Sequence, residues 1–188
     1  MSKSSTIDIE AFNWVRQGTD SSSTRYALAG IHFDPIGYHL TTTNGVALLR
    51  ADLSPNIGEA IAQALDNKPT LLLPPSGKIR WECSAIAKIN KDNISIFGNN
   101  FEISDNRYPN VDYFFNELNH YKSREDMIPF VDPYYLNMFF PKRTKSSGPA
   151  WTDPPKILIR PSTFSVYMDT YCHGFRAQGF IMGFGKAK

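Results

Sequence analysis

The chain has 188 residues, of which 41% are hydrophobic and 13% aromatic, a composition that supports a packed core and excludes an intrinsically disordered protein. Its 20 basic and 18 acidic residues give a net charge of +2. This near balance excludes a strongly basic nucleic-acid binder of the histone-arm type, while it leaves weaker contacts with nucleic acid open.

The first third of the chain predicts a helix followed by three antiparallel strands. From Asp8 to Val15 the apolar residues fall on one helical face. Residues 25–33 predict a strand that ends in an Asp-Pro turn, and residues 38–43 and 46–53 predict two more strands. Three sequential strands of this kind form an antiparallel meander.

The connection between the last two of these strands is the strongest turn signal in the chain. Asn44-Gly45 is typical of a tight type I′ hairpin. The apolar run Val46-Ala47-Leu48-Leu49 follows directly, where a hairpin tip normally meets water. Such a tip is costly to expose unless something packs against it.

The middle of the chain alternates helical and strand patterns, and residues 6–105 together predict one α+β unit. The expected elements are a helix over 56–67, a strand over 70–74, a helix opened by Ser76 with Ile79 and Cys83 on one face, and strands over 85–90, 94–98 and 101–105, the last after a turn at Asn99-Asn100.

Beyond Arg107 the sequence reads as an aromatic connector with one helical turn, followed by a second group of elements. Residues 131–140 predict a helix with Pro133 in its first turn. Residues 141–156 are rich in Pro, Gly, Ser and basic side chains and predict a loop. The closing strands are expected over 157–161, 164–172 and 179–185.

Four motifs in this order carry a resemblance to a known family. They are Arg25-Tyr26-Ala27-Leu28-Ala29-Gly30, Thr43-Asn44-Gly45-Val46-Ala47-Leu48, Leu73-Pro74-Pro75-Ser76-Gly77 and Tyr108-Pro109-Asn110-Val111. Their order and spacing resemble the middle domain of the bacterial DNA polymerase III β subunit, the sliding clamp. Residues 131–140 and the segment FIMGFG resemble parts of its C-terminal domain more loosely.

The resemblance implies an α+β, DNA-clamp-like fold of antiparallel sheets with packed helices. One full clamp domain is expected over 6–116 and a truncated C-terminal domain over 117–188. In the family, the apolar hairpin tip forms one wall of a cleft that binds short peptides of polymerases, loaders and repair proteins. The positions that correspond to this cleft are Leu28, Thr43, Gly45, Val46, Ala47, Leu48, Pro109, Phe114, Ile181 and Met182.

The chain departs from the family at several of these positions. Asn44 replaces an Asp, Val46-Ala47 replace His-Arg, Asp112-Tyr113 replace a basic pair, and Gly183 replaces a Pro. The polar rim of the cleft is therefore reduced. A more apolar cleft would select different peptides, and the alternative is that these residues pack in a domain interface, as most apolar residues do.

The clamp family lines its ring with helices whose Lys and Arg side chains contact phosphates without reading bases. The corresponding positions are Arg16, Lys78 and Arg80. They predict a sequence-independent contact with double-stranded DNA, and the alternative is ordinary solvated surface charge.

The sequence does not favour an enzyme, a metal site or a cofactor. Its four histidines form no His-x-x-x-His pair, and Cys172 and His173 would point to opposite faces of a strand. No paired carboxylates or phosphate-binding glycine motif occurs. Cys83 and Cys172 are expected to be reduced thiols. The start of the chain is unlike a signal peptide and no apolar run is long enough to span a membrane, so we expect a cytoplasmic protein with no membrane partner.

The function expected from the resemblance is that of a non-enzymatic sliding-clamp-like processivity factor in DNA replication or repair, of phage or prophage origin. It would assemble into a ring-like homo-oligomer around DNA and bind a DNA polymerase or another clamp-binding peptide. Two alternatives stay open: a clamp-derived peptide-binding adaptor that does not encircle DNA, and a virion or host-takeover protein that shares only the topology.

Overall fold

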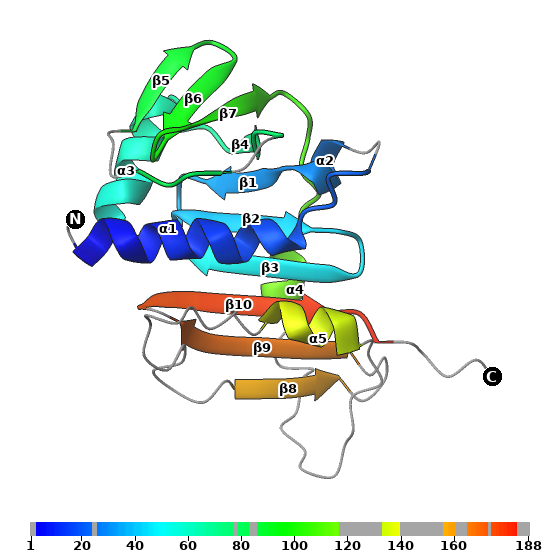
Figure 1. Ribbon diagram of the computed structural model, residues 1–188. Helices are drawn as coiled ribbons and strands as arrows, with labels where there is room; N and C mark the ends of the chain where they lie inside the picture. The colour runs from blue at the N-terminus through cyan, green and yellow to red at the C-terminus, as the bar shows by residue number, and fades with distance from the viewer. Residues whose placement is uncertain are drawn as a thin grey trace.

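The structure is a computed structural model that describes residues 3–23, 26–76, 79–82, 86–116, 133–139, 156–160, 165–172 and 174–183. The described strands form a 10-stranded antiparallel sheet in the order β5-β6-β7-β4-β1-β2-β3-β10-β9-β8 (Figure 1). The expected mixture of helices with antiparallel strands is therefore confirmed.

The strands are short and the helices are few. The strands are β1 (Ile31–Asp34), β2 (His39–Thr43), β3 (Ala47–Asp52), β4 (Thr70–Leu73), β5 (Ala87–Asn90), β6 (Asn93–Ile96), β7 (Asn99–Ser104), β8 (Lys156–Arg160), β9 (Ser165–Cys172) and β10 (Phe175–Ile181). The helices are α1 (Lys3–Val15), the 3-10 helix η1 (Arg16–Gly18), α2 (Tyr26–Ala29), α3 (Pro55–Ala64), α4 (Asp112–Asn116) and α5 (Pro133–Phe139).

Helix α1 lies across one face of the sheet (Figure 1). Its apolar residues Phe12 and Val15 are fully buried. They belong to the main core, which also holds alternate strand residues such as Phe33, Leu49 and Ala177. Burying side chains of this size contributes about 1.5–3 kcal/mol each, so this core is the principal source of stability.

The opposite face of the sheet carries a second, smaller core. Its central rung runs across four strands, with Leu48 opposite Phe180, Phe180 opposite Tyr167, and Tyr167 opposite Leu158. Helix α4 and the segment before it cover this rung with Val111 and Phe115. Strand β3 is therefore buried on both faces, which explains why the run after the hairpin turn is continuously apolar rather than alternating.

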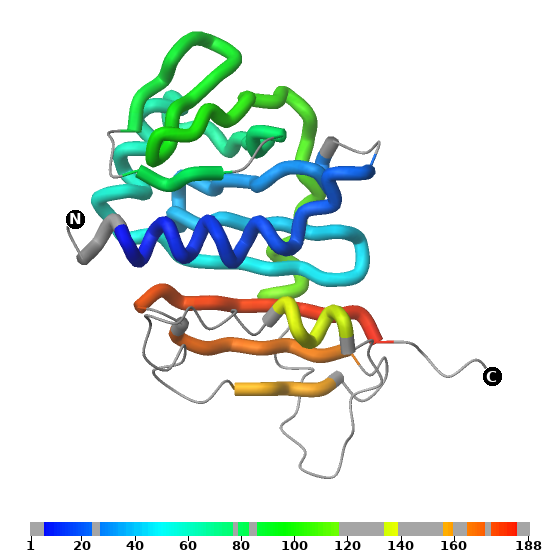
Figure 2. Tube along the Cα trace, in the orientation of Figure 1, coloured from blue at the N-terminus to red at the C-terminus, as the bar shows by residue number. Residues whose placement is uncertain are grey.

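Strands far apart in sequence meet at the centre of the sheet. Strand β10 pairs with β3, with Ala177 opposite Ala51 and Ile181 opposite Ala47. Figure 2 shows the trace of β10, near the C-terminal end, beside the hairpin of β2 and β3. Residues on either side of the boundary expected near 116 thus belong to one continuous sheet.

Buried polar contacts fix how the helices join the sheet. The carboxylate of Asp8 on α1 accepts hydrogen bonds from the backbone N and the hydroxyl of Ser54, both at 2.7 Å. Ser54 is the N-cap of α3, so Asp8 connects the two helices. On the sheet side, the hydroxyl of Thr42 donates to the carbonyl of Val15 at 2.7 Å.

Several local expectations are wrong. The last strand, expected over 179–185, begins earlier, as β10 (Phe175–Ile181). Residues 26–29 form the helical turn α2 rather than the start of a strand. Its Ala-Leu-Ala run has a high helix propensity, and the strand begins only after Gly30, where a Cβ would stand 2.6 Å from a methyl of Leu71.

The helix expected after Ser76 is absent from the described residues 79–82. Instead, the side chain of Asn99 brackets Arg80, accepting from its N at 3.2 Å and donating to its carbonyl at 3.0 Å. Glu82 N donates to the carbonyl of Phe97 at 3.0 Å. These contacts with the β6–β7 hairpin hold the backbone in a non-helical path.

The turn expected at Asn99-Asn100 lies two residues earlier. Phe97 and Gly98 have positive φ values of 50° and 78°, as a type I′ turn requires. Phe97 is a rare residue for this conformation, and its ring is buried against Phe12 and Trp81 at centroid distances of 6.2 and 6.3 Å. The packing of this ring compensates for the backbone strain.

Candidate functional site

An apolar pocket of about 230 Å³ opens at the tip of the β2–β3 hairpin. Its walls come from the hairpin itself, from α2, from the segment that enters α4, and from the end of β10. The residues that line it are Leu28, Thr43, Gly45, Val46, Ala47, Leu48, Pro109, Asn110, Val111, Phe114, Phe180 and Met182.

The hairpin wall is held by hydrogen bonds in the turn. The side chain of Asn44 accepts from the backbone N of Val46 at 3.0 Å and of Ala47 at 2.8 Å. Gly45 has a positive φ of 89°, whereas Asn44 has not, so the turn is centred on Gly45 and Val46 and the expected type I′ geometry at Asn44-Gly45 is wrong. Asn44 serves instead as a side-chain cap of the turn.

The wall from β10 is attached to the hairpin tip. Met182 N donates to the carbonyl of Val46 at 2.9 Å, which extends the β3–β10 pairing one step beyond the strand. Met182 keeps 51% of its surface exposed. A flexible thioether therefore stands at the mouth of the pocket, where it can adapt to what binds.

The opposite wall is aromatic. The rings of Phe114 and Phe180 lie 4.9 Å apart at 40°, and Tyr113, which is 53% exposed, meets Phe114 edge-on at 5.6 Å. Apolar surface thus continues from the buried rung at Leu48 out to solvent. An apolar surface of this kind is typical of a docking site.

Arg50 connects the aromatic wall to the sheet. Its guanidinium lies 3.8 Å from the centre of the Phe115 ring, and it forms an ion pair with Asp112 at the start of α4. The Nε atom of Arg50 also donates to the hydroxyl of Thr41 at 3.4 Å. The position of Phe114 therefore depends on a cation buried in strand β3.

Nine of the ten residues expected in the cleft meet at this pocket. Ile181 does not: its side chain points to the α1 face and is fully buried in the main core. Sequence reasoning missed Asn110, Val111 and Phe180. The alternation of a strand would have identified Phe180, because residues 180 and 182 share one face while 181 lies on the other.

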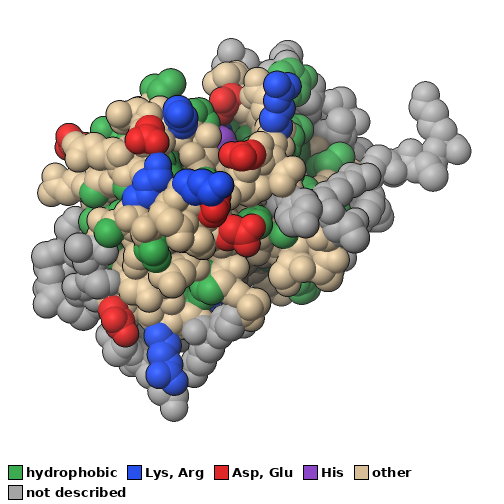
Figure 3. All heavy atoms as spheres, turned by 90° about the horizontal axis from the view of Figure 1, so that it is seen from above, with side chains coloured by type: hydrophobic (Ala, Val, Ile, Leu, Met, Phe, Trp, Pro, Cys, Tyr) green, Lys and Arg blue, Asp and Glu red, His purple; other side chains and the backbone are tan. Residues whose placement is uncertain are grey.

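The residues expected to contact DNA are partly described. Arg16 begins η1 at the end of α1 and is half-buried, and Arg80 is exposed. Trp81 Nε1 donates to Asn13 Oδ1 at 2.7 Å, so the segment with Arg80 lies beside α1. Lys78 lies outside the described residues. On the face seen in Figure 3, basic and acidic side chains are interspersed rather than grouped by sign.

Among the described residues, no group of three or more His, Cys, Asp or Glu side chains could hold a metal ion. Within the same ranges, no helix has the length and hydropathy needed to cross a membrane.

Comparisons of the chain with protein-family models, with curated proteins and with solved structures find no match. The resemblance to the sliding clamp therefore rests on the four motifs.

Proposed function

We propose that the chain is a sliding-clamp-like protein that binds a linear peptide of a DNA polymerase or of another replication or repair protein in the apolar pocket. One observation carries this proposal: the hairpin tip, the connector and the last strand meet at one pocket. Its lining includes positions at which the resemblance implies a peptide-binding cleft. Such a protein would act in the cytoplasm, where it meets the DNA.

The chemistry of the pocket suits one apolar anchor. A volume of about 230 Å³ accommodates a Leu or Phe side chain, whose burial contributes on the order of 1.5–3 kcal/mol. The hairpin wall is pre-organised by the Asn44 contacts, so little entropy is lost on binding. Micromolar affinity follows when backbone hydrogen bonds assist the anchor.

The arrangement of the fold also supports a clamp-like role. Helix α1 covers one face of the sheet and the pocket opens on the other. In a clamp-like assembly the helical face would turn toward DNA, where Arg16, Lys78 and Arg80 would contact phosphates, while the pocket stays free for the partner.

A fluorescence-polarisation titration with a labelled clamp-binding peptide tests the pocket. Met182→Asp should abolish binding because a carboxylate at the pocket mouth opposes an apolar anchor, and the exposed position leaves the fold intact. Ile36→Asp is the matched control: Ile36 is 91% exposed in the β1–β2 turn and lines none of the pocket. No binding by the parent at hundreds of micromolar would remove the proposed function.

Leu48 is a less suitable probe of the same pocket. It is only 3% exposed and belongs to the smaller core. Leu48→Asp is therefore expected to unfold the chain, which a thermal melt would reveal.

The second candidate, a peptide-binding adaptor that encircles no DNA, is favoured by the low positive charge near α1. Among the described residues there, Arg16 is half-buried, and the exposed Arg80 is followed two positions later by the exposed Glu82. Binding of a nicked plasmid at several salt concentrations separates the two. A clamp-like protein should lose affinity steeply with salt and on Lys78→Glu with Arg80→Glu, whereas an adaptor should bind the plasmid neither before nor after the change.

A further inference from the structure

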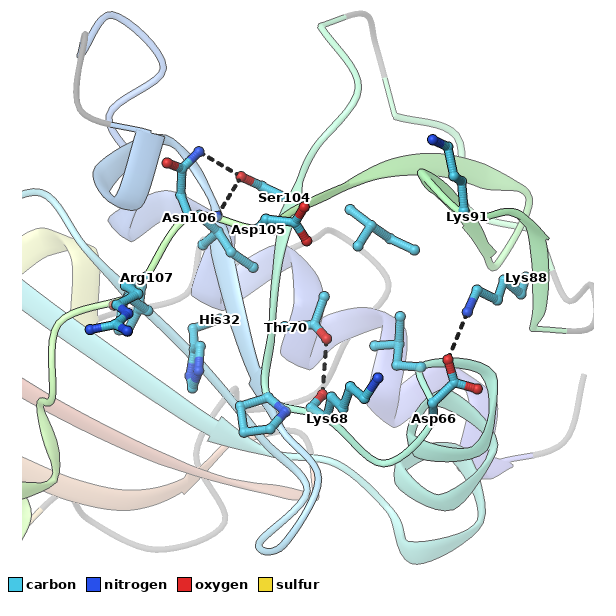
Figure 4. A pocket seen from close by; sticks show the side chains of 15 residues that line it. His32, Asp66, Lys68, Thr70, Lys88, Lys91, Ser104, Asp105, Asn106 and Arg107 are labelled. Carbon is cyan, nitrogen blue, oxygen red and sulfur yellow. Dashed lines mark hydrogen bonds and ion pairs between the residues drawn. The ribbon is translucent and has the colours of Figure 1, made fainter.

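A second pocket, of about 490 Å³, lies where strand β4 begins, strand β7 ends and the connector follows. Figure 4 shows Lys68, Lys88, Lys91 and Arg107 around it, together with the carboxylates of Asp66 and Asp105. We refer to this pocket as the basic groove. Cations outnumber carboxylates in its lining, so the groove favours an anionic ligand.

Most of these cations are free to bind. Lys88 forms an ion pair with Asp66 at 3.0 Å, which Figure 4 shows as a dashed line. Lys68, Lys91 and Arg107 are exposed and have no ion-pair partner among the described residues. An acidic ligand would therefore meet three cations that form no ion pair, against the one further carboxylate of Asp105.

One chain segment joins the basic groove to the apolar pocket. Residues 105–108 line the groove, and the next residues, 109–111, line the pocket. At the junction, the ring of Tyr108 stacks on His32 with a centroid distance of 4.7 Å and an angle of 12°. The stack holds the segment against β1, so the groove and the pocket lie at a fixed distance from each other.

The backbone of this segment is open. Within the described residues, no backbone–backbone hydrogen bond involves residues 105–110. The N–H of Asn106 donates to the hydroxyl of Ser104 at 3.3 Å. Backbone groups of the segment that form no such bond can pair with an extended peptide, as at the exposed edges that bind strand-like ligands.

We propose that the partner peptide carries acidic residues beside its apolar anchor and that these residues follow the segment 105–111 into the basic groove. This inference rests on the proposed function, because it needs an anchor in the apolar pocket. An extended chain advances about 3.3–3.6 Å per residue. Arg107 precedes Pro109 by two residues, so the acidic residues belong within a few positions of the anchor.

The test compares three labelled peptides with the same Leu-Phe anchor and with neutral, acidic or basic flanks, by fluorescence polarisation on the full chain. The acidic flank should tighten binding about two- to tenfold at low salt, and this gain should fade as salt is added. Lys68→Glu with Arg107→Glu should remove the gain and leave binding of the neutral peptide unchanged.

The matched control is Lys156→Glu, which changes an exposed cation of β8 that lies in neither pocket. It should keep the gain from the acidic flank. If all three peptides bind alike, the inference is overturned and the proposed function stands; if none binds, both fall. A short DNA duplex that displaces the acidic peptide and binds the groove more tightly would make it a phosphate site and overturn the inference as well.

Discussion

Arg50 is a charged side chain in the middle of the sheet, with only 9% of its surface exposed. Its charge is balanced by Asp112, by the hydroxyl of Thr41 and by the face of the Phe115 ring. The carboxylate of Asp112 is mostly exposed, so water also screens the ion pair. The packing of the guanidinium on Phe115 is therefore the stronger part of the contact.

This difference gives a prediction at the residue scale. Arg50→Ala should lower the free energy of unfolding by about 2–3 kcal/mol, because it removes the stacked cation and leaves space beneath α4. Asp112→Asn should cost less than about 1 kcal/mol. Urea unfolding of both variants measures the two values. Equal losses would show that the ion pair rather than the stack holds α4.

His32 gives a second prediction, on pH. Burial is the main cause that lowers the pKa of His32, against the opposing charges of Asp34 and Asp112. The unfolded chain therefore takes up a proton more readily than the folded one. The neutral form of His32 therefore favours the folded chain. This stabilisation is complete above a pH of about 6.5 and is lost as the pH falls below it.

Unfolding curves of the parent and of His32→Phe between pH 5 and pH 8 test this assignment. The Phe ring can still stack on Tyr108 but cannot take up a proton, so the stability of the variant should fall less on acidification. Parallel pH profiles would show that other groups cause the acid sensitivity.

At the scale of elements, the β2–β3 hairpin determines the pocket. Its Gly45 has a φ of 89°, and a Cβ placed there would meet no atom within 4 Å. Gly45→Ala should therefore cost about 1–2 kcal/mol through backbone strain alone. Gly45→Asn should cost less, because Asn tolerates positive φ. Thermal melts of the two variants give the comparison, and equal melting temperatures would contradict a strain-based account.

The elements that sequence predicted well are those whose patterns are local. The meander of β1, β2 and β3 and the helix through Phe12 follow from alternation, helical period and turn residues, and all are present. The predictions that are wrong concern residues with distant partners. The carbonyl and N–H of Arg80 bind the side chain of Asn99, and Phe97 takes a positive φ because its ring is buried. Spacing alone does not reveal such contacts.

The candidate site could be predicted from the sequence for a different reason. Three of the four motifs, those with Leu28, Val46 and Pro109, lie at the ends of elements that meet at the pocket, whereas Leu73 to Ser76 lie elsewhere. Ile181 lies outside the pocket because neighbouring residues of a strand point to opposite faces, which the motif alone does not reveal. The basic groove was not predicted at all, since Lys68, Lys88 and Arg107 come from three segments without a shared motif.

At the scale of the whole molecule, the sheet ends in two edges. Strand β5 is the last strand on one side, with all four residues exposed, and β8 is the last described strand on the other. Unpaired edges invite pairing with another copy of the chain. Pairing β5 of one copy with β8 of the next would form a head-to-tail interface. Repeating this interface closes a ring if the rotation between neighbouring copies is suitable.

Light scattering of the chain at 1 to about 200 micromolar tests this assembly. We expect a homo-oligomer, and Ile89→Pro should shift it toward monomer because proline weakens an edge for pairing. Ile89 has no partner residue in β6, so the substitution should spare the fold, as a thermal melt would verify. A strict monomer over the whole range would exclude the ring.

The pairing of β10 with β3 has a consequence for synthesis on the ribosome. The hairpin and the connector emerge long before β10, so β3 begins as an uncovered apolar edge and Leu48 lacks its neighbour Phe180. Contacts between segments this distant in sequence form slowly. During that interval the nascent chain exposes the apolar surface that later becomes the pocket, so it is most prone to aggregation before β10 is synthesised.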